Sequence, residues 1–260
     1  MYLDRDPAAP ANAWRAHRAR LRAWLAALTD DEWSGPTRCE LWDVSKLVQH
    51  LASGSQFLGY TLHKAGRGTA TTLLTDFDPH GMVQERAAML GDMRTQEALD
   101  TLASMDASVD AQLKTIAEVG WSSMAEAPLG HFAAHLSVNH FLFDSWVHEY
   151  DLMLPLHQNP VIETPEVEAV VAYLLALATV ATGSTTSLDV WLTEPDLRIG
   201  LAVVNDVARV AVGSVPDGAA VVEGTAQAVV DRTTGRRGGP VRGDERALAV
   251  LDEFGELLSG

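Results

Sequence analysis

Long stretches of helical periodicity fill the first part of the chain, up to about residue 155, and favour helices over any other structure there. In residues 12–28, apolar side chains recur every three or four positions, which is typical of an amphipathic helix. A separate stripe of that helix carries Arg15, Arg18 and Arg22. Asp43 is suited to cap a second helix that runs to about residue 64, because its carboxylate can accept hydrogen bonds from the free N–H groups of the first turn.

The same helical pattern continues in residues 95–119 and 130–154, and more weakly in residues 82–93. Four long amphipathic helices joined by loops predict an antiparallel four-helix bundle over residues 1–155.

The character of the sequence changes after residue 155. Pro155, Pro160 and Pro165 fall within eleven residues and indicate a linker. An apolar helix is expected over residues 167–182, followed by short β-branched runs that predict strands, the last over residues 219–230, and by a final helix over residues 244–258. We therefore expect an α+β protein of two domains, a helical domain over residues 1–155 and a smaller α/β domain over residues 156–260.

Composition excludes several classes of function. The chain has 35 acidic and 19 basic residues, and its formal charge of −16 argues against nucleic acid or an anionic membrane as its main partner. Cys39 is the only cysteine, which excludes a disulfide framework and a multi-cysteine zinc site. The N-terminus lacks the apolar core of a signal peptide, and the apolar run at residues 167–182 is shorter than a bilayer requires. These features predict a cytoplasmic protein. We expect it to be a monomer or a homodimer.

His50 interrupts an apolar helical face in the stretch LWDVSKLVQHLASG. Leu47, Val48 and Leu51 recur at helical spacing around it, so His50 lies beside core positions, where a polar group needs a partner. The expected helix over residues 130–154 offers six candidates: His131, His135, His140, Asp144, His148 and Asp151. At about 100° per residue, the two aspartates and His140 lie within about 80° of His148, whereas His131 and His135 point to the other side.

Asp144 and His148 stand at positions i and i+4 of that helix, close enough to bind one ion together. With His50 from a facing helix, they form a set of two imidazoles and one carboxylate, which suits catalytic zinc and other first-row divalent metals. Asp151 or His140 would then fix the tautomer of a histidine ligand. The alternative is a solvated helix pair and a histidine with polar neighbours, and spacing alone does not separate the two.

Two motifs resemble a known family. In LTDDEWSGPTRCELWDVSKLVQHLASG, an aromatic residue follows an acidic pair, and a Thr-x-Cys-x-x-Trp motif then precedes the helix that contains His50. This pattern is similar to the N-terminal signature of the mycothiol-dependent maleylpyruvate isomerase family, one of the DinB-like metal-binding four-helix bundles. FDSWVHEYDL resembles the family's later motif, with Asp144 four residues before His148 and Asp151 three residues after it.

The resemblance covers most of residues 12–154. It implies that His50, Asp144 and His148 bind a divalent metal, usually Zn²⁺. The family commonly has glutamate at the position of Asp144. The aspartate side chain is one methylene shorter than that of glutamate.

The second half of the chain resembles the family's small α/β domain, which is similar in shape to sterol carrier proteins. The match is strongest at TTGRRGGPVRGD. In the family an arginine of this domain faces the metal cleft, so the resemblance implies a catalytic role for Arg236, with Arg237 and Arg242 as alternatives. A guanidinium can hold a carboxylate by two parallel hydrogen bonds. The other interpretation of this stretch is a basic, solvated turn.

The resemblance implies an enzyme that uses mycothiol, a low-molecular-weight thiol, as co-substrate. A metal-coordinated thiol loses its proton, and the resulting thiolate would attack a small electrophilic, in some cases acidic, substrate. We expect S-transfer as the net reaction, with cis–trans isomerisation of a maleylpyruvate-like diacid as the first alternative and a non-catalytic metal- or ligand-binding regulator as the second. Cys39 and Trp42 are expected to pack in the core.

Overall fold

The computed structural model describes residues 1–74, 91 and 93–259. These residues form two compact units, one of Pro7–Val161 and one that combines Met1–Asp6 with Ile162–Gly260. The helix expected over residues 82–93 lies, apart from residues 91 and 93, outside the described residues.

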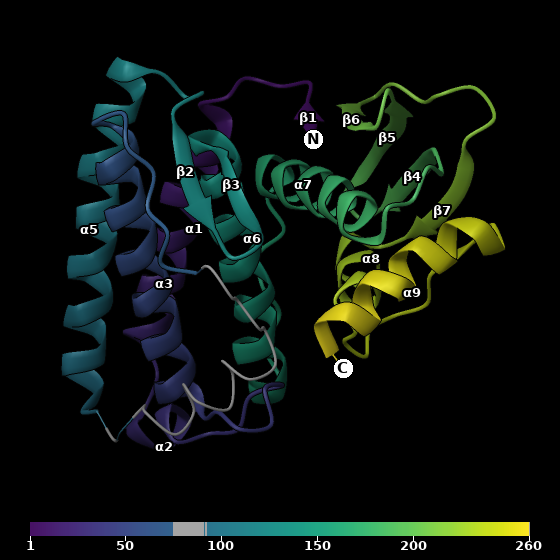
Figure 1. Ribbon diagram of the computed structural model, residues 1–260. Coiled ribbons are helices and arrows are strands. Elements are labelled where there is room, and N and C mark those ends of the chain that lie inside the picture. Colours follow the sequence, from purple (N-terminus) through teal and green to yellow (C-terminus); the bar gives the residue numbers. More distant parts are fainter. Residues whose placement is uncertain (75–90, 92, 260) are drawn as a thin grey trace. The chain divides into compact units, whose positions relative to one another are not determined.

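The first unit is built on four long helices, as the sequence predicts (Figure 1). They are α1 (Ala9–Leu25), α3 (Val44–Ala65), α5 (Thr95–Val119) and α6 (Ala134–Met153). Two short helical segments accompany them, α2 (Asp30–Trp33) after α1 and a 3-10 turn (Leu154–Leu156) after α6. α3 packs along α5, and α1 packs along α6. The predicted cap of α3 is confirmed, because Oδ1 of Asp43 accepts a hydrogen bond of 2.8 Å from the backbone N–H of Lys46.

Residues 130–133 form a strand, so the prediction that the fourth helix begins at residue 130 was wrong. β3 (Gly130–Ala133) pairs antiparallel with β2 (Met124–Ala127). Gly130 has a φ of 124°, a conformation that other residues rarely adopt, and the chain reverses into a hairpin there. His131 therefore lies on a strand, and its angle on the helical wheel has no meaning.

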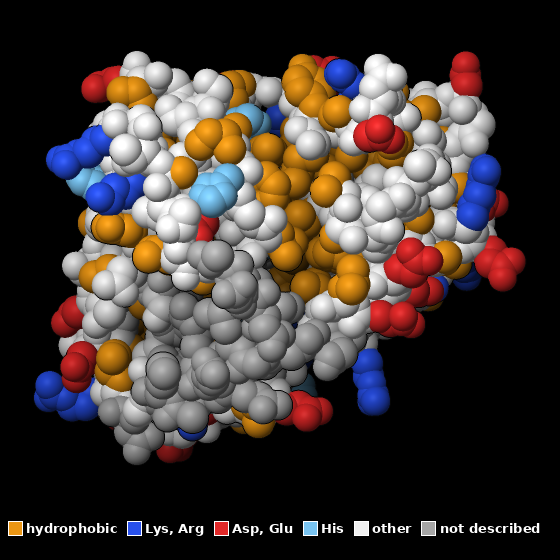
Figure 2. Space-filling view, viewed as in Figure 1, with side chains coloured by type: hydrophobic (Ala, Val, Ile, Leu, Met, Phe, Trp, Pro, Cys, Tyr) orange, Lys and Arg blue, Asp and Glu red, His pale blue; other side chains and the backbone are white. Residues whose placement is uncertain are grey.

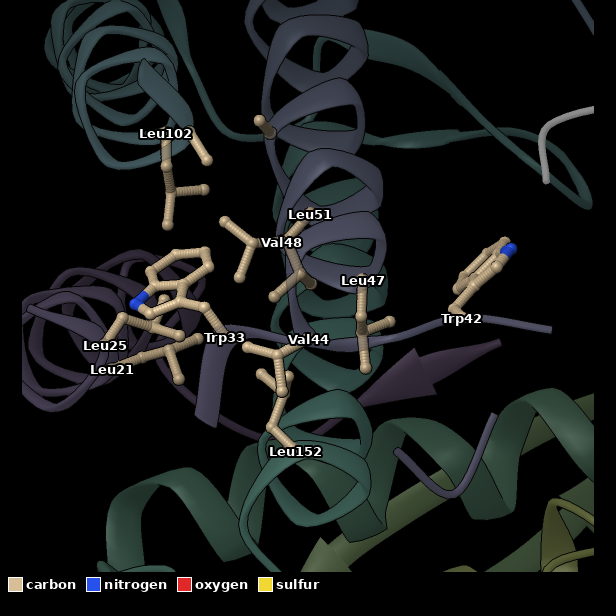
Figure 3. Close-up of a cluster of buried hydrophobic side chains, with 12 residues drawn as sticks. Leu21, Leu25, Trp33, Trp42, Val44, Leu47, Val48, Leu51, Leu102 and Leu152 are labelled. Atoms are coloured by element: carbon tan, nitrogen blue, oxygen red, sulfur yellow. The ribbon is translucent and has the colours of Figure 1, made fainter. Parts of the chain in front are cut away.

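A cluster of buried apolar side chains joins the four long helices (Figure 3). The residues that surround His50 in the sequence, Leu47, Val48 and Leu51, are each at most 2% exposed, which confirms the apolar face predicted for α3. Their neighbours in the cluster include Leu21, Leu25, Trp33, Trp42, Val44, Leu102 and Leu152. This core fixes α3 against the other helices and so fixes the height at which His50 lies in the bundle.

A buried polar network also connects the helices. Arg18 of α1, expected on a stripe apart from the apolar face, is only 2% exposed. Its guanidinium donates to both carboxylate oxygens of Asp106 on α5 at 3.0–3.2 Å, and to the hydroxyls of Ser55 on α3 and Ser145 on α6. Arg22 adds a bond of 2.9 Å to the same carboxylate. The periodicity of α1 does not show this burial, because the partner of Arg18 belongs to another helix.

The second unit is a six-stranded sheet with the strand order β1-β6-β5-β4-β7-β8 and three helices (Figure 1). The strands are β1 (Tyr2–Leu3), β4 (Leu188–Thr193), β5 (Asp196–Val204), β6 (Val207–Val212), β7 (Ala220–Gly224) and β8 (Arg242–Gly243). The helices are α7 (Thr164–Thr182), α8 (Ala226–Thr233) and α9 (Glu245–Ser259). Leu188, Val190 and Leu192 of β4 are fully buried, whereas Trp191 between them is 41% exposed, so the core lies on one face of the sheet.

Two details of this unit differ from the sequence-based expectation. Tyr2 and Leu3 pair in parallel with β6, so Met1–Asp6 belong with the sheet and not with the bundle. Residues 219–230, expected as one strand, form β7 and then α8. The helix begins because the Thr225 hydroxyl accepts a hydrogen bond of 3.1 Å from the N–H of Ala228, a capping interaction that competes with strand continuation.

The apolar helix and the final helix of the second unit are confirmed as α7 and α9. Among the described residues, α7 alone is long and apolar enough to cross a membrane, and 72% of that window is buried in the structure, as in a core helix. Carboxylate side chains gather on the outer surface of α9 (Figure 2). They belong to Glu245, Asp252, Glu253 and Glu256, and they account for part of the formal charge of −16.

The buried network predicts a large stability difference between two aspartates of α5. Asp106→Ala leaves the buried Arg18 without its carboxylate and should lower the free energy of unfolding by about 3–5 kcal/mol. Asp110→Ala removes only partly exposed pairs with Arg15 and Lys114 and should cost less than about 1 kcal/mol. Urea unfolding of both variants measures the difference, and equal losses would contradict the role given to the network.

Candidate metal centre

His50, Asp144 and His148 converge from two helices. His50 lies on α3, and the other two stand one turn apart on α6. The Nε2 atom of His50 is 3.6 Å from Oδ1 of Asp144, and the Nε2 atom of His148 is 3.5 Å from the same oxygen. The three ligand atoms all lie within 4.8 Å of one another. The structure thus brings together the three residues that the sequence analysis proposes as metal ligands.

The two spacings to Asp144 fit ligands of one ion better than they fit hydrogen bonds. A hydrogen bond from N–H to oxygen spans about 2.7–3.2 Å, which is shorter than both distances. Two atoms that each lie about 2.0–2.2 Å from a tetrahedral ion are about 3.3–3.6 Å apart. Two imidazoles and one carboxylate are also a donor set that leaves a fourth position for a substrate. The residues present therefore fit a divalent metal.

Asp151 fixes the orientation of one candidate ligand. His148 is 8% exposed and Asp151 is fully buried, so both need partners within the protein. Nδ1 of His148 lies 2.9 Å from Oδ2 of Asp151, one helical turn further on. When the imidazole is neutral, the Nδ1–H group donates to this carboxylate and the lone pair remains on Nε2, the atom nearest Asp144.

The charges at the site favour a cation. Burial by itself would lower the pKa of His148, but the charge of the nearby Asp144 carboxylate and the polar contacts with Asp144, Asp151 and Cys39 raise that pKa well above its usual value. Burial opposes ionisation of Asp144 as well, yet His148 and His50 hold its pKa well below the usual range. Asp144 is therefore ionised near neutral pH, and binding of a metal at Nε2 would release a proton from His148.

Trp42 borders both histidines. Its ring centroid lies 4.8 Å from that of His50 and 6.4 Å from that of His148, while the two imidazoles meet edge to face at 4.9 Å. Trp42 is 5% exposed and belongs to the core, as expected from the sequence. Its second role, as the indole that restrains the His50 ring, does not follow from helical periodicity because Trp42 lies in the loop before α3.

The remaining histidine candidates have other surroundings. His140 packs against Phe141 and Phe143, and burial lowers its pKa to about 4 despite the opposing effect of Asp144. Nε2 of His131 lies 2.6 Å from the carbonyl oxygen of Thr71, and Nδ1 of His135 lies 3.2 Å from that of Trp121. His131 and His135 are thus engaged with the backbone.

Two neighbours of Asp151 were not proposed as site residues. Nε of Arg38 donates to Oδ1 of Asp151 at 2.9 Å, and Sγ of Cys39 lies 3.4 Å from Oδ2. Sγ of Cys39 is also 3.9 Å from Nδ1 of His148. The sequence predicts a packing role for Cys39 and gives no site role to Arg38. The available signal was their place within the Thr-x-Cys-x-x-Trp motif.

Arg236, the proposed catalytic arginine, lies in the second unit. It follows α8, is half-buried, and donates its backbone N–H to the carbonyl oxygen of Asp231 at 2.7 Å. Arg237 and Arg242, the two alternatives, are exposed.

The helical unit and its His–Asp–His cluster define a four-helix bundle with a candidate metal centre. Residues 14–153 match the sequence model of the mycothiol maleylpyruvate isomerase N-terminal domain. Because this match covers more than half of the chain, the chain belongs to that family, and the resemblance seen in the sequence is confirmed.

Solved structures agree with the family match. Two crystal structures of mycothiol-dependent maleylpyruvate isomerase, one of them a histidine-to-alanine mutant, are similar in fold with a TM-score of 0.64. They are 17% and 18% identical in sequence, and the similarity covers 93% of this chain and 94% of theirs. None of the curated proteins compared with the chain matches it. These structures confirm the predicted α+β architecture. Membership of the family bears out the prediction of an enzyme.

The ligand assignment makes a direct prediction. Purified protein should bind about one divalent metal per chain, and His50→Ala and His148→Ala should each lose most of it, because two ligands hold an ion much more weakly than three. Metal analysis by mass spectrometry measures the occupancy. His131→Ala and His135→Ala serve as controls and should keep the metal. Full occupancy in both His50→Ala and His148→Ala would contradict the assignment.

Proposed function

We propose that this chain is a metal-dependent enzyme that adds the sulfur of mycothiol to an electrophilic carbon of a small substrate, with S-transfer as the net reaction. The observation that carries the proposal is the convergence of His50, Asp144 and His148 within a bundle of the mycothiol maleylpyruvate isomerase family. The imidazoles and the carboxylate suit a divalent ion, and the family favours Zn²⁺.

A divalent ion held by His50, Asp144 and His148 would act as a Lewis acid that keeps the thiol of the co-substrate deprotonated. The protein's own contribution is to prepare the ligands. Asp151 holds the Nδ1–H of His148, and Trp42 restrains the ring of His50. The short side chain of Asp144 still lies 3.5–3.6 Å from both Nε2 atoms, which supports aspartate as a functional replacement for the usual glutamate.

Isomerisation is the second candidate, favoured by one observation. The two similar solved structures, which cover 93% of this chain, are of a maleylpyruvate isomerase. In that reaction the thiolate adds to a carbon of the double bond of a maleylpyruvate-like diacid. The resulting single bond rotates, and expulsion of the thiolate restores the double bond in the trans form. Both candidates share the addition step and differ in the fate of the adduct.

The two candidates predict different thiol balances. Zinc-loaded protein is incubated with mycothiol in two parallel reactions. One reaction also contains monobromobimane, and the other also contains maleylpyruvate. Free thiol is titrated, and the products are followed by absorbance. S-transfer predicts loss of one thiol for each bimane adduct, at a rate above that of protein-free buffer. Conversion of the diacid with no net thiol loss would instead establish isomerisation. If the metal-loaded protein accelerates neither reaction, both candidate functions are contradicted. The remaining alternative is then a non-catalytic metal- or ligand-binding regulator.

We further propose that Arg236 binds a carboxylate of the substrate, as the resemblance implies. The support is chemical, since a guanidinium holds a carboxylate in a fixed orientation and can offset charge that develops during the reaction. Arg236→Ala should keep the metal and the fold but lose at least about tenfold in turnover of an acidic substrate, which corresponds to about 1.4 kcal/mol of barrier. Arg237→Ala and Arg242→Ala are the matched controls. Unchanged turnover in all three variants would overturn the proposal and confine the chemistry to the helical unit.

A further inference from the structure

Arg38 forms two hydrogen bonds with Asp151, the residue that orients the candidate metal ligand His148. Its Nε donates to Oδ1 of Asp151 at 2.9 Å, and its backbone N–H donates to the carbonyl oxygen of the same residue at 3.0 Å. Asp151 is fully buried, and an ionised carboxylate at such a position depends on charged or hydrogen-bonding partners. The two bonds attach both the side chain and the main chain of Asp151 to one loop residue.

The two carboxylate oxygens of Asp151 have different partners. Oδ1 accepts from Arg38, and Oδ2 accepts from Nδ1–H of His148 at 2.9 Å and from the thiol of Cys39 at 3.4 Å. A guanidinium bond on Oδ1 sets the rotation of the carboxylate about its terminal torsion, which is otherwise broad. Oδ2 is then presented to the histidine in one fixed direction.

The loop that carries Arg38 is itself well fixed. Oγ1 of Thr37 accepts from the N–H of Cys39 at 3.0 Å and donates to the carbonyl oxygen of Trp42 at 2.7 Å. Pro36 and Asp43 pair across the base of this turn. Arg38 thus approaches Asp151 from a closed turn, and the same turn places Trp42 against the ring of His50.

We propose that Arg38 is a positioning residue of the metal centre. By holding Asp151, it keeps the Nδ1–H of His148 hydrogen-bonded. Nε2 of His148 is then directed at the proposed metal position, which His50 and Asp144 also face. The inference rests on the proposed function for the identity of the centre and adds a residue that acts through Asp151. Its positive charge alone would disfavour a bound cation. If removing Arg38 lowers the metal affinity, the cause is therefore the lost positioning of His148 and not the lost positive charge of Arg38.

Two substitutions separate the hydrogen bond from the charge. Gln carries an amide nitrogen at the side-chain position of the arginine Nε, whereas Met carries a methyl group there. Arg38→Gln and Arg38→Met both remove the charge, but only the first keeps a donor for Oδ1 of Asp151. Arg20→Met is the matched control, because Arg20 pairs at 3.4 Å with Glu149, another buried carboxylate of α6 that lies two residues before Asp151.

Zn²⁺ affinity is measured on metal-stripped protein by competition with a chromophoric chelator. Arg38→Met should bind Zn²⁺ at least about tenfold more weakly than the wild type, the loss typical when the partner of a ligand histidine is disturbed. Arg38→Gln should keep most of the affinity, and Arg20→Met all of it. Equal affinities of Arg38→Met and Arg38→Gln, or an affinity of Arg38→Met at or above that of the wild type, would overturn the proposal. Arg38→Ala replaces Arg38→Met if the latter does not fold.

A second measurement needs no metal. The Nδ1–H proton of His148, bonded to a buried carboxylate, should give a protected downfield signal in the proton NMR spectrum. The signal should persist in Arg38→Gln and Arg20→Met and be lost or shifted in Arg38→Met. Persistence in Arg38→Met would count against Arg38 even if the wild type proved to bind no metal. Failure of Zn²⁺ binding in the wild type, by contrast, would overturn the proposed function.

Discussion

The burial of α6 governs the rest of the helical unit. This helix is buried around most of its circumference from Leu136 to Met153, and yet it carries ionisable side chains. Each of them has to be satisfied inside the bundle, since an isolated buried charge is very costly. Glu149 meets Arg20 of α1, and Asp151 meets Arg38 of the loop before α3. The polar partners of α6 therefore decide which elements pack around it, as much as its apolar side chains do.

The candidate metal centre follows from the same constraint. In an apolar core, a buried histidine beside two buried or half-buried carboxylates is energetically unfavourable unless protons or a cation balance the negative charge. Asp144 and Asp151 lie on opposite sides of the His148 ring, one near Nε2 and the other near Nδ1. Both nitrogens of the ring thus have a carboxylate neighbour. Only on the Nε2 side does a second long helix, α3, contribute a residue, His50.

Local spacing explains how much could be predicted from the sequence. The helical repeat around His50 and the i, i+4 spacing of Asp144 and His148 depend only on residues within one or two turns, and helices formed where these patterns predict them. The pairing of these two helices was supported by the resemblance of both motifs to the family. Arg38 was missed because its partner lies 113 residues away, and no local pattern reports such a contact.

Other errors have similarly physical causes. Arg18 lies on a stripe that periodicity would give to solvent, but a carboxylate from α5 makes its burial favourable. The hairpin of β2 and β3 includes Gly130 at a positive φ, and the helical periodicity of the sequence gives no sign of this turn. In the second unit, a cap formed by the Thr225 hydroxyl marks the start of α8, where the sequence predicts that a strand continues.

The pairing of β1 with β6 has a topological consequence. Because Tyr2 and Leu3 belong to the sheet, the backbone passes between the two units twice, at Asp6–Pro7 and again at Val161–Ile162. The bundle is in effect an insertion within the α/β unit. β1 is synthesised about two hundred residues before β6, its only partner among the described strands. Until then its backbone groups remain unpaired, and a fusion or deletion at the first residues would act on the sheet edge at β6 and not on the helices that follow it in sequence.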